Sequence, residues 1–342
     1  MSPLTATQQA VEVRDELSRD FPALGDRAEL APWHLRVVNY ERPSTGTLRP
    51  AAAASGTHPA ALSPTTRLLI SCPARPGVTH ALGVFLSNEA VDVLGIDQRT
   101  SADGRTFIRA ELHCPPGAPQ RILERRFRDS MARPWSMNYR IAEAGRRKRI
   151  AVLVSRYDHC LVDLLWRARR GEFDADIGLV ASNHPDLKPL ASGFGVPWQH
   201  VPVDKDSKAE GERRLLDALA GHFDLVVLAR YMQILSGDFL RSLGCPVINV
   251  HHSLLPAFIG AGTYERAIKR GVKLIGATAH YVTPELDAGP IIEQDAIRIS
   301  DRDHLEAVTC LGADLERLVL ARAVAWHCQD RIVVHNNTTV IF

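Results

Sequence analysis

Residues 149–182 read RIAVLVSRYDHCLVDLLWRARRGEFDADIGLVAS and decide the fold class of the chain. RIAVLVS (149–155) is a continuous apolar run, which is typical of a strand buried on both faces of a parallel sheet. DHCLVDLLWRARRGE (158–172) has apolar residues at helical spacing, and Asp158 is suited to cap that helix. DIGLVAS (176–182) is a second apolar strand. The stretch therefore predicts a strand–helix–strand unit with parallel strands.

The same alternation continues to the C-terminus. Further elements are predicted at PWQHVPV (197–203), KAEGERRLLDALAGH (208–222), DLVVLA (224–229), PVINVH (246–251), LIGATAHYVT (274–283), PIIEQDAIRI (290–299), a long helix over 303–329, RIVVH (331–335) and TTVIF (338–342). We expect an α/β fold over 149–342, with a doubly wound, mostly parallel sheet. Functional sites in such sheets lie beyond the carboxyl ends of the strands. Because neither G-x-G-x-x-G nor a Walker loop follows the first strand, no nucleotide site is expected.

Residues 67–140 follow a different order. Strand patterns occur at RLLISC (67–72), VDVLGIDQRT (91–100), RTFIRAELHC (105–114) and SMNYRI (136–141), and helical patterns occur at 73–90 and 116–131. The order β-α-β-β-α-β predicts a ferredoxin-like α+β domain before the α/β domain. This region carries no converging set of His, Asp, Ser or Cys, so we expect no catalysis there.

Two further segments are interpreted as linkers. Residues 1–66 hold a short helical pattern at 7–17 and then a stretch rich in Pro, Ala, Ser, Thr and Gly, which predicts a flexible extension. A docking arm that folds onto a partner is the alternative. The basic segment 141–148, with the run GRRKR at 145–149, is interpreted as a solvated interdomain linker rather than a nucleic-acid patch.

The composition excludes several classes of protein. A length of 342 residues is typical of about two globular domains. The balance of 41 Lys and Arg against 39 Asp and Glu leaves a net charge of +2, so no nucleic-acid partner is expected. No apolar run suits a membrane span, and the N-terminus has no secretory-signal pattern. The six cysteines form no C-x-x-C pair, which favours reduced thiols in the cytoplasm over a zinc or disulfide framework.

The segment VINVHHSLLPAFIGAG (247–262) is the richest in chemically useful residues. Asn249 and His251 are two residues apart at the end of an apolar strand, so their side chains point to the same side. Pro256 and Gly260 indicate a shaped loop after that strand. An isolated N-x-H is also consistent with hydrogen-bonded core residues that have no catalytic role.

A second polar cluster lies in GATAHYVTPELDAGPIIEQ (276–294). His280 is on a predicted strand, and Asp287 precedes Gly289 in the loop that follows. Asp before Gly is often a simple turn residue. Because apolar strands flank this loop, we expect a partly desolvated carboxylate whose pKa is raised toward the range of a general base.

A third segment, DLVVLARYMQILS (224–236), runs from a strand into an apolar loop. Met232, Ile234 and Leu235 are consistent with core packing. Beyond a strand end, the same residues are also suited to the wall of a pocket for a flat aromatic ring.

These segments together resemble a known family. INVHHSLLPAFIGA (248–261), ARYMQILS (229–236) and HYVTPELDAGPIIEQD (280–295) resemble the folate-dependent formyltransferases, and most closely the formyltetrahydrofolate deformylases. The resemblance covers 67–342, and the part that contains SCPARPGV (71–78) is similar to an ACT domain. It implies an ACT-like domain over 67–140 and a formyltransferase-like catalytic domain over 149–342.

The resemblance implies a catalytic role for Asn249, His251 and Asp287. The implied reaction is hydrolysis of formyltetrahydrofolate to tetrahydrofolate and formate, as part of one-carbon metabolism and purine biosynthesis. Asp287 would activate water, while Asn249 and His251 would stabilise the formyl oxyanion. No metal is needed for these steps.

The resemblance also implies the substrate-binding residues. The pteridine ring would lie against Met232, Gln233 and Leu235, together with Tyr281 and Val282. His280 is expected to have a supporting role next to the catalytic residues. An amino-acid effector of the ACT-like domain and a homo-oligomer are further implied.

Two departures leave alternatives open. Ala74 occupies a position that is usually acidic in ACT turns, which weakens the case for an effector there. In the catalytic loop, GTYERA (262–267) matches the deformylase pattern cleanly only at Tyr264. The alternative activity is formyltetrahydrofolate-dependent N-formylation of a small amine, and a third is a regulatory folate-binding protein without turnover.

Overall fold

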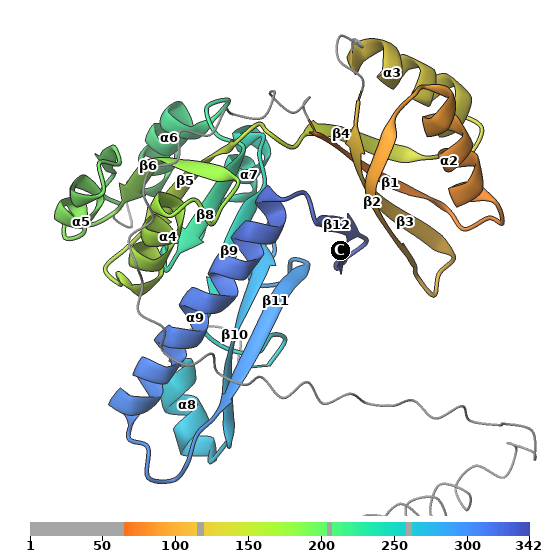
Figure 1. The fold of residues 1–342 in the computed structure, drawn as a ribbon. Coiled ribbons are helices and arrows are strands. Elements are labelled where there is room, and N and C mark those ends of the chain that lie inside the picture. The colour runs from red at the N-terminus through yellow and green to blue at the C-terminus, as the bar shows by residue number, and fades with distance from the viewer. Residues whose placement is uncertain (1–64, 115–119, 204–206, 258–261) are drawn as a thin grey trace, which may run out of the picture. The chain divides into compact units, whose positions relative to one another are not determined.

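The computed structural model describes residues 65–114, 120–203, 207–257 and 262–342 (Figure 1). The predicted extension 1–66 lies almost entirely outside these described residues, and so do the helical pattern at 7–17 and the loop residue Gly260. Within the described part, no helix is long and apolar enough to cross a membrane.

The first sheet is antiparallel and has the strand order β2-β3-β1-β4. Its strands and helices are β1 (Thr65–Pro73), α2 (Val78–Asn88), β2 (Asp92–Thr100), β3 (Arg105–His113), α3 (Gln120–Phe127), a π-helical turn η1 (Arg128–Ala132) and β4 (Asn138–Glu143). The helices bury Leu82, Phe85 and Phe127 against Ile70 and Ile108 of the sheet. The β-α-β-β-α-β order agrees with the ferredoxin-like topology that the sequence predicts.

The second sheet has the order β11-β10-β9-β8-β5-β6-β7. Its strands are β5 (Lys148–Val154), β6 (Ala175–Ser182), β7 (Trp198–His200), β8 (Leu225–Ala229), β9 (Val247–His251), β10 (Leu274–Tyr281) and β11 (Ile291–Arg298). Five adjacent strands are parallel to one another: β9, β8, β5, β6 and β7. Strand β10 is antiparallel to β9, and β11 is antiparallel to β10. The prediction of a mostly parallel α/β sheet is confirmed.

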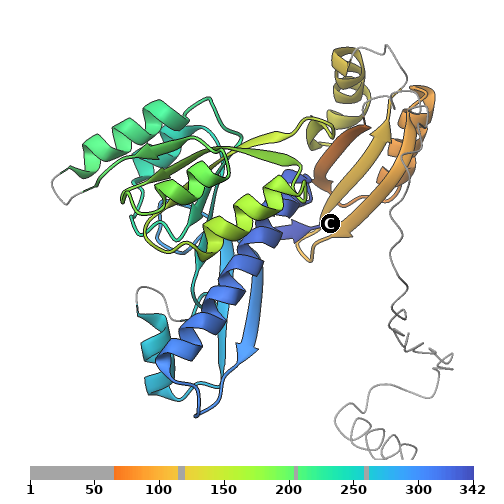
Figure 2. The same ribbon diagram turned by 60° about the vertical axis from the view of Figure 1, so that its left-hand side comes forward.

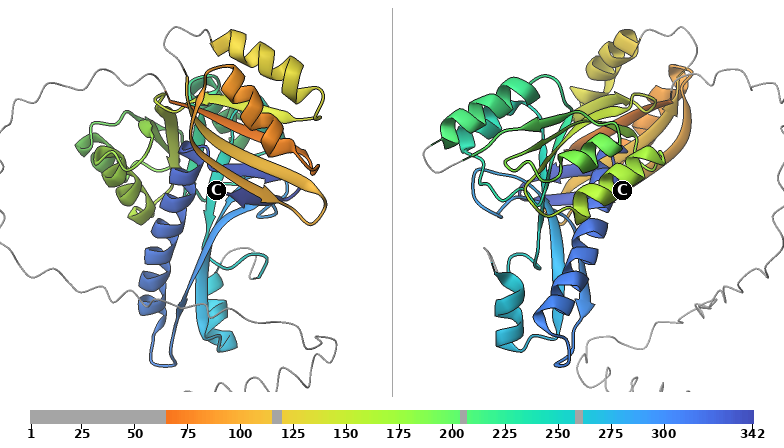
Figure 3. Two further views of the ribbon diagram at one scale, coloured as in Figure 1. Left: turned by 45° about the vertical axis from the view of Figure 1, so that its right-hand side comes forward. Right: turned by 90° about the vertical axis from the view of Figure 1, so that its left-hand side faces the viewer.

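Helices cover both faces of this sheet. They are α4 (His159–Arg169), α5 (Lys188–Gly193), α6 (Lys208–Leu219), α7 (Gly237–Leu243), α8 (Thr263–Arg270) and α9 (Leu305–Cys328). One core packs α4 and α9 against the sheet, and another packs α6 and α7 against it. Figures 2 and 3 show α9 lying along β10 and β11. A hairpin of β12 (Ile332–His335) and β13 (Thr338–Ile341) follows α9.

The basic segment differs from the predicted solvated linker at one residue: residues 145–147 are exposed, as expected, but Lys148 is not. Lys148 is the first residue of β5 and is buried. Its Nζ pairs with the buried carboxylate of Asp330 and donates to the Cys328 carbonyl at 3.0 Å. Arg67 and Arg140 pair with the same carboxylate at 3.4 and 2.8 Å. A buried cation is stable only when it is paired, so Lys148 belongs to the folded structure.

Candidate active site

Strand β9 presents Asn249 and His251 at its carboxyl end, as the N-x-H spacing predicts. The antiparallel register places His280 of β10 directly opposite Asn249. Asn249 Nδ2 lies 3.2 Å from His280 Nε2, and His280 Nδ1 lies 2.9 Å from the Tyr281 carbonyl oxygen. The ring donates from Nδ1 to that carbonyl oxygen, and the contact at Nε2 holds the Asn249 carboxamide in place.

The loop after β10 folds back and carries Asp287 to the same place. Asp287 has a left-handed backbone, with φ of 54°. A Cβ on Gly289 would lie 1.8 Å from the Tyr281 carbonyl oxygen, so only glycine permits this close approach of loop and strand. As a result, Asp287 Oδ2 lies 3.3 Å from His251 Nδ1, and Oδ1 lies 3.7 Å from His280 Nε2. The structure thus brings the three predicted catalytic residues together.

The carboxylate of Asp287 is nearly buried, with 8% of its side chain exposed. Its pKa is nevertheless lowered, first by the interaction with the His280 ring and then by the charge of His251, which together outweigh desolvation. The sequence-based expectation of a raised pKa is therefore wrong in direction. Two imidazoles beside the carboxylate favour its charged form more than burial disfavours it.

These residues line a cavity of about 250 Å³. Met232, Gln233, Leu235 and Val282 line it together with His280 and the three predicted catalytic residues, Asn249, His251 and Asp287. The Met232 side chain is 51% exposed, and that of Ile234, which also lines the cavity, is 59% exposed. Exposed apolar side chains at the edge of a cavity are typical of a binding surface for an apolar ring.

Tyr281 was predicted to contact the pteridine ring, but the structure places it outside the cavity. It is not among the residues that line the cavity, and its hydroxyl lies 2.7 Å from His327 Nδ1 at the end of α9. Burial raises the pKa of Tyr281 and lowers that of His327 to about 3. The hydroxyl of Tyr281 therefore donates to a neutral imidazole, which ties β10 to α9.

Ser155, at the end of β5, positions the apolar loop that begins at Arg230. Its Oγ accepts from the Met232 backbone amide at 2.9 Å and donates to Asn183 Oδ1 at 2.7 Å. Arg230 has a φ of 62°, which turns the chain out of β8 and into this loop. Sequence reasoning missed Ser155 and Asn183, although Ser155 ends one predicted strand and Asn183 directly follows another.

A buried acidic residue behind the cavity was also missed. Glu316 of α9 is 1% exposed and accepts from Tyr264 Oη at 2.6 Å and from His159 Nε2 at 2.8 Å. Tyr264 belongs to α8, so GTYERA is the start of a helix and not a loop. The sequence signal that could have identified Glu316 is an acidic residue on the apolar face of a long helix, one turn after Gly312.

His159, Cys160 and Glu316 lie close enough together to hold a metal ion. The Glu316 oxygens, however, already accept hydrogen bonds, and the cation Arg230 lies 3.4 Å away.

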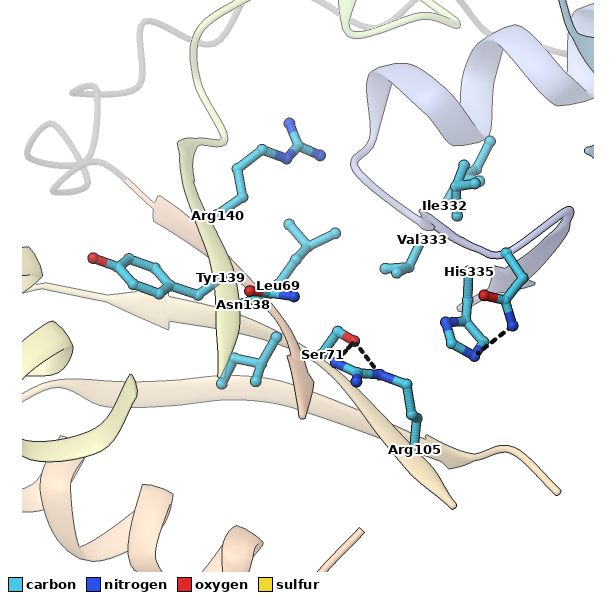
Figure 4. Close-up of a pocket in the computed structure, with 12 residues that line it drawn as sticks. Leu69, Ser71, Arg105, Asn138, Tyr139, Arg140, Ile332, Val333 and His335 are labelled. Atoms are coloured by element: carbon cyan, nitrogen blue, oxygen red, sulfur yellow. Dashed lines mark hydrogen bonds between the residues drawn. The ribbon is translucent and has the colours of Figure 1, made fainter. Parts of the chain in front are cut away.

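A larger cavity of about 550 Å³ lies between β1, β3, β4 and the β12–β13 hairpin (Figure 4). Arg105 donates to Ser71 Oγ on one wall, and His335 lies across from it. None of the predicted catalytic or substrate-binding residues lines this cavity. The catalytic set is therefore confined to the smaller cavity.

Comparison with known proteins identifies relatives from one family. The formyl transferase family matches residues 148–324. The chain is 50% identical to the formyltetrahydrofolate deformylase of Mycobacterium tuberculosis over 279 residues, which covers 81% of this chain and 90% of that protein. It is 43% identical to the formyltetrahydrofolate deformylase of Bacillus subtilis, with 81% and 93% of the two chains covered.

Solved structures of a deformylase and of a transformylase are also similar to this chain. The crystal structure of a formyltetrahydrofolate deformylase from Pseudomonas syringae has a TM-score of 0.78 and 43% identity, and the match covers 82% of this chain and 95% of that one. A glycinamide ribonucleotide transformylase from Symbiobacterium toebii has a TM-score of 0.55 and 30% identity, and the match covers 58% and 95%. The chain belongs to the formyltetrahydrofolate deformylase family.

Proposed function

We propose that the protein is a hydrolase that converts formyltetrahydrofolate and water into tetrahydrofolate and formate. The observation that carries this proposal is the meeting of Asn249, His251 and Asp287 in one cavity. The relatives, named formyltetrahydrofolate deformylases at 40 to 50% identity, support the same reaction.

In the proposed mechanism, the formyl oxygen accepts hydrogen bonds from the Asn249 amide and from protonated His251. The contact of 3.3 Å between His251 Nδ1 and Asp287 stabilises the imidazolium. As water attacks the formyl carbon, negative charge develops on the oxygen, where both donors are already aimed. His280 holds the Asn249 amide and is therefore a positioning residue.

Asp287 is proposed to orient the attacking water and to accept its proton. Its lowered pKa keeps the carboxylate charged at neutral pH, so it holds the proton of water only transiently, while the oxygen of that water bonds to the formyl carbon. The proton then passes to the folate nitrogen as the bond between that nitrogen and the formyl carbon breaks. The second proton of water leaves for solvent as formic acid ionises, so the products are tetrahydrofolate, formate and one proton. These steps use the chain's own residues without a metal.

The pteridine ring is proposed to lie against Met232, Gln233, Leu235 and Val282. The backbone of this wall is fixed by Ser155, so the wall is formed before substrate arrives. Preorganisation of this kind lowers the entropy lost on binding.

The test is formate release from formyltetrahydrofolate, with and without an added amine. We expect formate to appear with water as the only acceptor. If formate is absent and a formylated product forms only when the amine is present, the hydrolase assignment is wrong and the alternative N-formyltransferase is right.

We further propose that a carboxylate effector, such as an amino acid, binds in the 550 Å³ cavity. Arg105 supports this, because among the described residues its guanidinium contacts only Ser71 and has no carboxylate partner. The test is formate release with each amino acid added in turn, for the wild type and Arg105→Gln. An effect that is present in the wild type and lost in the variant supports the site, and equal responses contradict it.

We also propose a homo-oligomer and a cytoplasmic location. Strand β2 is an edge of its sheet, and its apolar residues Val93, Leu94 and Ile96 are 44, 60 and 43% exposed, which supports pairing with a second copy. All six cysteines are free thiols, which supports a reducing compartment.

A further inference from the structure

A polar cluster beside the catalytic cavity has no role in the mechanism above. Its centre is the Glu316 carboxylate of α9, which accepts from Tyr264 Oη of α8 at 2.6 Å and from His159 Nε2 of α4 at 2.8 Å. Arg230, in the loop after β8, places its Nε 3.4 Å from the same carboxylate. Four separate segments of the chain are thus joined at one buried charge.

Several features of this cluster are unfavourable for stability. Gly312 lies inside α9, where glycine weakens a helix, and a Cβ there would lie 2.0 Å from Tyr264 Oη. Arg230 adopts a left-handed backbone, and its buried Nε has no hydrogen-bond partner among the described residues. Buried charge, backbone strain and a helix-interior glycine are retained together mainly at functional sites.

The cluster reaches the catalytic cavity through Arg230 and His252. Both line the cavity, whereas Glu316 lies behind them. The His252 ring is 5.1 Å from the ring of His251 and 5.7 Å from that of Tyr264. His252 also lines a neighbouring cavity of about 80 Å³ that Tyr264 borders. Tyr264 therefore limits the space next to His252, whose ring neighbours that of His251.

The cluster also sets the charge of this part of the cavity. The Arg230 side chain is 10% exposed and stacks on the Tyr157 ring, with 4.8 Å between the guanidinium and the ring centroid. Its position is thus fixed from two sides, by Glu316 and by Tyr157. Burial and the charge of Arg230 lower the pKa of His252 to about 4, so His252 is neutral near neutral pH. Arg230 is therefore the cationic residue of this wall, and the carboxylate of Glu316 is shielded behind it.

We infer that Arg230, held by Glu316 and Tyr264, is a specificity-determining residue that excludes amine acceptors, so that water alone takes the formyl group. This inference rests on the proposed function. Most amines are protonated in water, and a fixed guanidinium repels an ammonium group while it does not repel water. The two carboxylates nearby that could attract an ammonium group already have partners. Glu316 contacts Tyr264, His159 and Arg230, and Asp287 contacts His251.

The two competing reactions differ only in the nucleophile. In hydrolysis, a C–O bond forms, the bond to the folate nitrogen breaks, and a proton from water passes to that nitrogen. In transfer, a neutral amine forms a C–N bond, the same bond breaks, and the proton from the amine passes to the folate nitrogen. Because both need the same oxyanion support, the choice depends on which nucleophile enters the cavity.

The test measures the ratio of formylated amine to formate, with glycinamide as the amine. This ratio compares two products of the same active sites, so it does not depend on how much of a variant is folded or on its overall rate. For the wild type, we expect formate and almost no formylglycinamide. For Arg230→Gln and Tyr264→Ala, we expect the ratio to rise about tenfold or more, because a charge or a steric barrier is removed.

Arg213→Gln is the matched control, since it removes an exposed arginine of α6 that does not line the cavity. Its ratio should equal that of the wild type. An unchanged ratio in both Arg230→Gln and Tyr264→Ala, with formate still released, overturns the inference and leaves the hydrolase assignment intact. Failure of the wild type to release formate would instead overturn the proposed function.

Discussion

Asp287 Oδ2 lies 3.3 Å from His251 Nδ1, although His251 ends strand β9 and Asp287 lies in the loop between β10 and β11. The contact depends on the loop after β10 folding back against that strand. This fold brings Gly289 close to the carbonyl oxygen of Tyr281. In the proposed mechanism, this carboxylate stabilises the charged form of the imidazole beside the carboxamide of Asn249. The proposed chemistry depends on this pair.

Replacing Asn249 by Ala removes one of the two proposed donors to the formyl oxygen. We expect kcat to fall about a hundredfold, with little change in KM, because the charge on that oxygen develops in the transition state. Steady-state formate release checks this. A kcat within a factor of about three of the wild type would remove Asn249 from the mechanism.

Replacing Gly289 by Ala places a Cβ where the Tyr281 carbonyl oxygen lies. The loop must move, and Asp287 moves with it, so we expect formate release to fall about a hundredfold or more. Gly193→Ala is the control, because a Cβ there meets no atom within 4 Å. Equal activity of the two variants would show that the close approach does not position Asp287.

The stability of the protein should depend on pH through His327. Burial lowers the pKa of His327 from 6.5 to about 3, so the unfolded chain binds a proton at a higher pH than the folded one. Its contribution to stability is therefore complete above pH 6.5 and is lost as the pH falls toward 3. Denaturant unfolding of wild type and His327→Gln should show a smaller loss of unfolding free energy in the variant over this range. Parallel curves would contradict the buried, neutral state of His327.

The exposed edge strand β2 gives a prediction about assembly. Ile96→Lys places a charge on the apolar edge, so we expect the proposed oligomer to dissociate, with a lower mass in analytical ultracentrifugation. Leu305→Lys is the control, since Leu305 is similarly exposed, at 42% against 43% for Ile96, but lies at the start of α9. A monomeric wild type, or an unchanged mass for Ile96→Lys, would rule out this edge as the interface.

The sequence predicts much of the fold because its signals are local. Continuous apolar runs identify β5, β8 and β9, and the two-residue spacing of Asn249 and His251 places both side chains at one strand end. The short helices α5, α7 and α8 were missed, because six to eight residues give too few turns for a clear apolar period.

The parts of the site that were missed depend on contacts between distant segments. Glu316 is recognisable only once α4, α8 and the loop at Arg230 surround it. Tyr281 was assigned to the cavity from its place in a motif, but it neighbours His280 on a strand, and adjacent strand residues point to opposite faces. The direction of the pKa shift of Asp287 was predicted wrongly because it depends on the imidazoles of His280 and His251, and only His280 is close to Asp287 in the sequence.

Formate release by Asp287→Asn shows whether the charge of Asp287 is needed for turnover. The substitution keeps the size of the side chain and removes the charge that accepts the proton of water and stabilises the His251 imidazolium. We predict that turnover of formyltetrahydrofolate falls about a thousandfold or more while the variant still binds tetrahydrofolate and unfolds cooperatively. Turnover by Asp287→Asn at a rate close to that of the wild type would contradict the account.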